Sequence, residues 1–217
     1  MEFVMAGAPV EDPVGAVATY IANHERVIAE YDLAERPGGP NEISARDVLQ
    51  TRITNLRITS SELQYFVDRS FNAPWQLLPE GARLVDADPT VEGGLYDDAE
   101  ELYRAFYNGR PRGMVPGKIH VILHFKRPTF FPILDGRVRG IYEEMAREVS
   151  RSMRDFRRGR QGRLYWAAIR QDLIDGADVL DAVRKELAER DEPASFGAQL
   201  SDVRLHDILC WEIVRLR

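Results

Sequence analysis

Apolar side chains recur at spacings of three and four residues along most of this chain, which is the period of one helix face. Ser44, with Asp47 three residues later, is a candidate helix N-cap, and Ser60 or Ser61 is another. The pattern therefore predicts a mostly α fold whose core is assembled from both ends of the chain. The helices are expected within residues 14–31, 44–56, 60–67, 96–107, 136–156, 164–169 and 178–190, and from residue 201 onward. A further helix is expected to open at Lys118, to carry His120 and His124, and to end before the loop that contains Lys126 and Arg127.

Proline and glycine interrupt the helical pattern most clearly at two places. The tetrad Pro37-Gly38-Gly39-Pro40 ends the first helical segment, and residues 74–89 are too rich in proline for regular structure. We expect an N-terminal helical segment with its linker over residues 1–40, followed by a helical domain over 41–217. Within that domain, residues 110–142 carry the most informative motif.

The composition is typical of a globular protein with one sizeable core, or with two small lobes that share a cleft. The chain has 217 residues, of which 44% are hydrophobic and 29% charged. It starts without a basic region ahead of an apolar run, and no stretch approaches about 18 uninterrupted apolar residues, so we expect neither secretion nor a membrane span. The single cysteine, Cys210, lies among apolar neighbours and is expected to be a buried thiol. These features predict a cytoplasmic protein.

The formal net charge of −6 conceals an uneven distribution along the chain. Residues 110–170 contain 15 Lys and Arg against 5 Asp and Glu, so the rest of the chain is strongly acidic. A cationic face on an acidic protein attracts phosphate locally while the remainder limits indiscriminate binding. The alternative is that these arginines only solvate the exposed sides of helices.

One stretch, residues 117–139, predicts a helix, a loop broken by prolines, and a second helix. Lys118 opens the first helix, and Asp135 stands where the second begins, in the position of an N-cap. This arrangement resembles the catalytic core of the helix-hairpin-helix DNA glycosylases, in which a hairpin lysine or its equivalent precedes a helix, a short loop and an aspartate. It is also similar to a bacterial domain family with no assigned activity. The resemblance implies a glycosylase-like helical fold.

The resemblance also implies roles for the lysine and the aspartate. Asp135 would stabilise oxocarbenium-like charge on the sugar or activate the attacking nucleophile. Lys118 lies 17 residues earlier, about the separation seen in the family, and would form a Schiff base in members that also cleave the strand. The alternatives are a purely structural cap for Asp135 and a solvated lysine in the first turn of a helix for Lys118.

Phosphate contacts would have to come from side chains, because the hairpin departs from the Gly-Val-Gly-like turn of the family. Its glycines, Gly113 and Gly117, are four residues apart, and Pro116 removes one backbone donor. Of the flanking cations, Lys126 and Arg127 are the more favoured phosphate contacts, because residues in a loop are freer to bind a ligand. The candidate nucleic-acid-binding residues are Arg110, Arg112, Lys126, Arg127, Arg137 and Arg139.

No metal site or cofactor is expected. His120 and His124 share a helix face, but neither a third ligand nor the glutamate of a His-Glu-x-x-His pattern can be identified. One cysteine excludes the iron–sulfur cluster of some glycosylases. A flipped base would need aromatic side chains around it. The candidates for this lining are Trp75, Tyr107, Tyr165 and Trp166.

Three classes of function remain open. The chain is a base-excision enzyme that breaks an N-glycosidic bond with Asp135, a nucleic-acid binder that retains the fold without the reaction, or an interaction protein whose arginines meet an acidic partner. DNA and an acidic protein are thus the two partners considered. Oligomeric state, substrate base, strand preference and pathway are not determined by the sequence.

Overall fold

The computed structural model describes residues 3–152 and 161–216, and within them the protein is mostly helical, as predicted. A two-stranded antiparallel hairpin near the N-terminus, which the pattern did not predict, joins β1 (Phe3–Met5) to β2 (Ala8–Val10). The α-helices are α1 Pro13–Asn23, α2 Glu25–Val27, α3 Ala45–Gln50, α4 Ser60–Ser70, α5 Leu95–Tyr107, α6 Pro116–Lys126, α7 Gly136–Ile141, α8 Glu143–Ser152, α9 Gln161–Asp175, α10 Ala177–Ala188 and α11 Asp202–Leu216. The end of the helix predicted over 136–156, from residue 153, lies outside the described residues.

Short turns of other helix types complete the chain. A π turn, η1 (Ile28–Asp32), follows α2, and the 3-10 turns are η2 Thr51–Thr54, η3 Trp75–Leu77, η4 Leu84–Asp86 and η5 Ala194–Gln199. Two of these turns, η3 and η4, lie in the proline-rich segment that was expected to lack regular structure.

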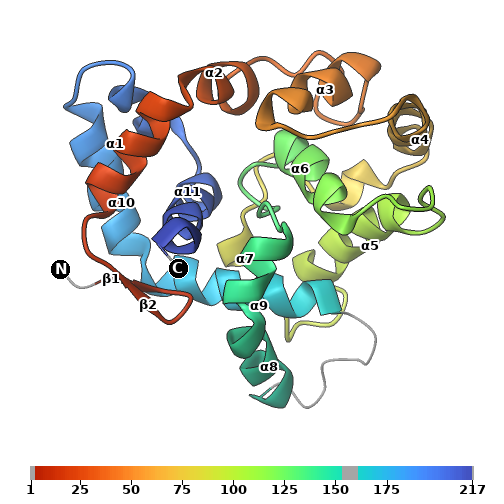
Figure 1. Cartoon of the computed structure of the whole chain (residues 1–217). Helices are drawn as coiled ribbons and strands as arrows, with labels where there is room; N and C mark the ends of the chain where they lie inside the picture. Colours follow the sequence, from red (N-terminus) through yellow and green to blue (C-terminus); the bar gives the residue numbers. More distant parts are fainter. Residues whose placement is uncertain (1–2, 153–160, 217) are drawn as a thin grey trace.

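The two ends of the chain pack together on one side of the molecule, and the middle of the chain forms the other side (Figure 1). Helix α1 contacts α10, α11 and η5, whereas α3, α4, α5 and α6 pack on one another. One hydrophobic core cluster runs through both sides, from Met5 to Ile213. This arrangement matches the predicted core built from both ends of the chain.

Local capping signals account for several helix starts. Ser44 and Asp47 form the predicted capping box of α3. The corresponding box of α4 uses Thr59 and Glu62, one residue ahead of the predicted Ser60 or Ser61. Asp135 caps α7, as expected. Each of these carboxylates is therefore positioned by the first turn of its own helix.

Two predicted helices are interrupted. The helix predicted over residues 14–31 breaks at His24, where the backbone leaves helical geometry before α2 begins. The helix predicted from residue 136 is divided at Tyr142 into α7 and α8, although backbone hydrogen bonds continue across the junction.

Helix α6 is surrounded by protein: every residue from Ile119 to Arg127 is buried. A helix that is apolar on all sides belongs in a core, but this one carries Lys126 at its C-terminal end. The Lys126 ammonium lies 3.1 Å from the carboxylate of Asp47, which is also buried. That carboxylate accepts hydrogen bonds from the backbone N–H groups of Ser44 and Gly38 as well.

The predicted linker is tied to the same carboxylate. A Cβ atom on Gly38 would lie 2.2 Å from Asp47 Oδ2, so only glycine permits this close approach. The predicted boundary at residue 40 is thus a turn held against α3 and the end of α6.

We expect Lys126→Met to lower the free energy of unfolding by about 3 kcal/mol or more, because it leaves the buried Asp47 carboxylate without its cation. Urea denaturation of both proteins measures the loss. Adding Asp47→Asn to the variant should recover part of it. The matched control is Arg112→Met at an exposed position, with an expected effect within about 0.5 kcal/mol. If Lys126→Met and Arg112→Met lower the free energy of unfolding equally, Lys126 has no structural role.

Candidate functional site

A pocket of about 590 Å³ opens where the two sides of the molecule meet. Its volume lies within the range of about 300–1,000 Å³ that is typical of small-molecule sites. Apolar side chains form much of its wall, and two aspartates, two arginines and a lysine supply the charge. The lining residues are Tyr20, His24, Val27, Thr54, Asn55, Leu56, Val115, Pro116, Gly117, Lys118, Val121, Ile133, Leu134, Asp135, Gly136, Val138, Arg139, Arg204, Asp207 and Trp211.

Asp135 is half-buried on the wall of this pocket, at the start of α7. One carboxylate oxygen, Oδ1, accepts hydrogen bonds from the backbone N–H groups of Arg137 and Val138, both at 2.8 Å. The cap fixes the position of the side chain while the pocket keeps it accessible. Capping and ligand contact are therefore compatible at this residue.

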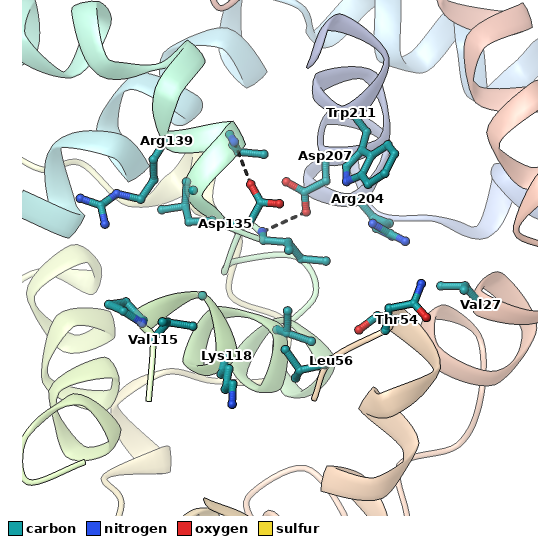
Figure 2. A pocket seen from close by; sticks show the side chains of 18 of the residues that line it. Val27, Thr54, Leu56, Val115, Lys118, Asp135, Arg139, Arg204, Asp207 and Trp211 are labelled. Atoms are coloured by element: carbon teal, nitrogen blue, oxygen red, sulfur yellow. Dashed lines mark hydrogen bonds between the residues drawn. The ribbon is translucent and has the colours of Figure 1, made fainter. Parts of the chain in front are cut away.

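Asp207, on α11, faces Asp135 (Figure 2). Its side chain is 4% exposed, and Oδ2 accepts a hydrogen bond from the backbone N–H of Ile133 at 3.1 Å. The other oxygen, Oδ1, has no hydrogen-bond partner among the described residues. Burial raises the pKa of Asp207 to about 8; Arg204 opposes the rise, and the negative charges of Asp32 and Asp135 add to it.

A buried ion pair lies beside Asp207. Arg204 Nε donates to Asp32 Oδ1 at 2.9 Å, and Arg204 Nη2 donates to the hydroxyl of Tyr20 at 3.3 Å. Burial raises the pKa of Asp32, against the effect of Arg204. Because Asp32 balances its charge, Arg204 does not provide Asp207 with a full counter-ion.

Sequence reasoning did not identify Asp207 as a site residue. The sequence did contain a signal: the apolar run of the last helix is interrupted by Arg204, His206 and Asp207. Charged residues are almost never fully buried unless they are paired, so their presence in such a run indicates either an ion pair or a site.

Lys118 lines the opposite wall, and its ammonium points away from Asp135 (Figure 2). Its Nζ lies 2.6 Å from Glu62 Oε1, the acid of the α4 capping box. Burial alone would raise the pKa of Glu62, but hydrogen bonds from Lys118 and Thr59 outweigh it and leave that pKa lowered. A Schiff-base nucleophile must reach the sugar with a free amine, whereas the Lys118 side chain is engaged with Glu62 and points away from Asp135 (Figure 2). The pairing thus disfavours the expected nucleophilic role.

Two of the six candidate phosphate-binding cations lie in the interior, which corrects the expectation that they are free to meet a ligand. Lys126 pairs with Asp47, and Arg127 donates to the backbone carbonyls of Leu78, Pro40 and Lys126. Burial lowers the pKa of both cations. The physical reason is that both residues lie at the end of a buried helix, so acceptors on neighbouring segments, rather than solvent, surround their charged groups.

The other four candidate cations are more accessible. Arg112 and Arg137 are exposed, whereas Arg110 and Arg139 are half-buried, and Arg139 lines the pocket. Arg110 packs over the ring of Tyr107 and donates to two backbone carbonyls. Arg139 packs over Tyr165. The structure therefore brings Asp135, Lys118 and Arg139 to one pocket and leaves Lys126 and Arg127 out of it.

Neither candidate histidine is arranged as a metal ligand. His120 Nδ1 lies 3.1 Å from the Pro116 carbonyl, and its Nε2 accepts from the indole of Trp166. His124 Nδ1 lies 2.7 Å from the Phe131 carbonyl. Burial lowers the pKa of His120 to about 4 and that of His124 to about 3. Within residues 3–152 and 161–216 no group of three or more His, Cys, Asp or Glu is placed to hold a metal ion.

The four aromatic residues expected around a flipped base do not line this pocket. Trp75 and Trp166 are buried in the core, and Tyr107 and Tyr165 lie beneath Arg110 and Arg139. The aromatic side chains that do line it are Tyr20, His24 and Trp211. Cys210 is fully buried, as predicted.

The structure is that of a mostly helical protein with a pocket whose lining includes two aspartates. The chain belongs to a family of unknown function (DUF6308), whose model matches residues 13–214. No curated protein and no solved structure matches the chain. The likeness to helix-hairpin-helix glycosylases gains no support from these comparisons and stays a prediction. No described helix is long and apolar enough to cross a membrane.

The raised pKa of Asp207 predicts a pH-dependent stability. The folded state favours the protonated carboxyl, so its contribution is fully present below about pH 4 and is lost as the pH rises through about 8. Asp207→Asn removes this titration. We therefore expect the variant to gain stability relative to the wild type between pH 4 and pH 8, with each pKa unit worth about 1.4 kcal/mol.

Urea denaturation of the two proteins at several pH values checks this expectation. Asp191→Asn, at an exposed position, is the control and should show no such trend. A difference between wild type and Asp207→Asn that does not change with pH would contradict a raised pKa.

Proposed function

We propose that this protein hydrolyses an N-glycosidic bond in DNA, with Asp135 and Asp207 as the reacting pair. The observation that carries the proposal is the meeting of these two carboxyl groups at one wall of a pocket large enough for a nucleotide. Their environments differ: Asp135 is half-buried and hydrogen bonded by a helix start, whereas Asp207 is buried, and its Oδ1 is a buried oxygen without a hydrogen-bond partner among the described residues. Two carboxyl groups in unlike environments can serve as base and acid.

In the proposed reaction, Asp207 donates its proton to the base as the bond between the sugar C1′ and the base nitrogen breaks. The bonding electron pair leaves with the base, and the Asp135 carboxylate stabilises the positive charge that develops on the sugar. A water molecule then attacks C1′ and gives its proton to Asp135. The products are the free base and an abasic sugar, and proton exchange with solvent restores both carboxyl groups.

DNA is proposed as the substrate because of the cations around Asp135 and the sequence resemblance. Arg137 and Arg139 follow Asp135 directly, and Arg112 is exposed in the loop that leads to the pocket wall at Val115. Arginine is well suited to phosphate contacts. The sequence resemblance of residues 110–142 to helix-hairpin-helix glycosylases is the second support for this chemistry.

The first test is base release from oligonucleotides that contain damaged or mismatched bases. We expect wild-type protein to produce abasic sites and Asp135→Asn to lose this activity by about 100-fold or more, because a neutral amide cannot stabilise the cationic sugar. Circular dichroism and urea unfolding verify that the variant is folded; Asp135→Ser, which retains an N-cap side chain, is a second variant with the same expected loss.

Salt-sensitive binding by both proteins without base release from any substrate would overturn hydrolysis. That outcome would favour a nucleic-acid binder without a reaction. An absence of both binding and release would favour an interaction protein that meets an acidic partner.

Lys118 is expected to be dispensable for base release. Lys118→Gln breaks the ion pair with Glu62 and should lower the free energy of unfolding by about 1.5–3 kcal/mol, because the two side chains are largely buried. Base release should persist in this variant at a temperature where it is folded. Trapping with borohydride, which reduces a Schiff base to a stable adduct, measures covalent chemistry directly. A trapped adduct in wild type that disappears in Lys118→Gln would restore the lysine as a nucleophile.

A further inference from the structure

Three aromatic side chains form one continuous wall of the pocket, here called the stacking wall: Tyr20 of α1, His24 at the C-terminal cap of α1, and Trp211 of α11. The rings of Tyr20 and His24 are stacked with centroids 4.3 Å apart, and the ring of His24 meets the edge of Trp211 at 6.4 Å. The wall brings together side chains from opposite ends of the chain, and it is distinct from the aromatic core around Trp166.

Hydrogen bonds and cations brace the stacking wall. His24 Nδ1 lies 2.9 Å from the Tyr20 carbonyl, and the Tyr20 hydroxyl accepts from Arg204 at 3.3 Å. The guanidinium of Arg204 also lies over the Tyr20 ring, and that of Arg137 lies over the Trp211 ring. Rings held in this way lose little freedom when a ligand stacks on them, which favours binding.

Trp211 differs from the other two tryptophans in being accessible. It is 40% exposed, whereas Trp75 and Trp166 are buried. A single exposed aromatic residue is ordinary on a protein surface. Trp211, however, is exposed at a pocket and contacts His24, which in turn stacks on Tyr20, and such a platform suits the flat face of a heteroaromatic ring.

The segment across the pocket from Trp211 offers a polar edge. Figure 2 shows Trp211 on one side and Thr54 and Leu56 on the other. Asn55 lies between these two residues, with a left-handed backbone (φ 62°) that asparagine tolerates better than most residues. Asn55 is exposed and lines the pocket, and its side-chain amide makes no hydrogen bond with the described part of the chain. An amide provides both a donor and an acceptor to a ligand.

We propose that this part of the pocket binds a purine or pyrimidine base, which stacks on Trp211 and forms hydrogen bonds with the Asn55 amide. Val27 and Leu56 complete an apolar slot around the base. A planar ring with donors and acceptors on its edge is the ligand class that matches one aromatic face and one free amide. The inference rests on the proposed function for its substrate class, and it assigns the base to the α1 and α11 side of the pocket.

Binding is measured separately from the reaction by using Asp135→Asn as the background. The probes are a fluorescein-labelled single-stranded oligonucleotide and the same oligonucleotide with tetrahydrofuran abasic sites, and the readout is fluorescence anisotropy. We expect Trp211→Ala to weaken binding of the base-containing probe about tenfold or more, and Trp211→Phe to weaken it less. Neither change should affect the abasic probe. Arg112→Gln is the matched control, because Arg112 is exposed and does not belong to the stacking wall, so loss of its proposed phosphate contact weakens both probes equally.

Asn55 is tested by a nearly isosteric change. Asn55→Asp keeps the shape and the tolerance of a left-handed backbone but removes the donor, so it should alter the preference among homopolymer probes of adenine, cytosine and thymine. Asn55→Gly keeps the backbone and removes the amide, and it should reduce that preference. Unchanged preference in both variants would overturn the role of Asn55.

The two proposals fail in different ways. Trp211-dependent binding of the base-containing probe, combined with no base release by the wild type, would leave the base site standing and reject hydrolysis. Base release together with equal effects of Trp211→Ala on both probes would leave hydrolysis standing and reject the base site.

Discussion

The structure depends on a buried helix, α6, that carries a lysine near each end. Lys118 pairs with Glu62 and Lys126 pairs with Asp47, and both acids are the N3 residues of the capping boxes that start α4 and α3. Each acid thus starts its own helix and also neutralises a lysine of α6. Removing a charge from water costs several kcal/mol unless a partner is present, so α6 can be buried only with both helices in place.

The position of α6 also sets the geometry of the pocket. Its first turn contains Gly117, where a Cβ atom would lie 3.3 Å from the Leu134 carbonyl and 3.6 Å from Asp135 Cα. A side chain there would push against the segment that leads into α7. Glycine therefore lets the start of α6 and the start of α7 approach closely, and this approach places the Asp135 carboxylate at the pocket wall.

Features set by neighbouring residues could be predicted from the sequence, and features set by distant residues could not. The caps at Ser44 and Asp135 follow from short-range patterns, and so does the mostly helical fold. The Glu62–Lys118 pair joins residues 56 positions apart, and the Ile133–Asp207 hydrogen bond joins residues 74 positions apart. No local pattern encodes such contacts.

The errors at the candidate site have the same origin. Lys126 and Arg127 were expected to be accessible because they precede Pro128, yet the apolar run from Ile119 to Phe125 indicates burial of the whole helix end. The aromatic lining was expected from Trp75, Tyr107, Tyr165 and Trp166, whereas Tyr20 and Trp211 come from helices near opposite ends of the chain. Asp135 was identified because its role as a cap is local, and its partner Asp207 was missed because only the tertiary fold brings the two together.

Some cations of this protein are buried and others are accessible, and this difference affects how it would bind a nucleic acid. Residues 110–170 carry a large excess of positive charge, but Lys118, Lys126 and Arg127 serve the interior of the fold and cannot release counterions from DNA. The accessible charge beside the pocket is thus smaller than the sequence indicates, and the protein as a whole is acidic. Affinity would then have to come less from phosphate contacts than from the pocket itself, where an aromatic wall and two carboxyl groups face the same space. That balance favours recognition of a single nucleotide over broad binding along a duplex.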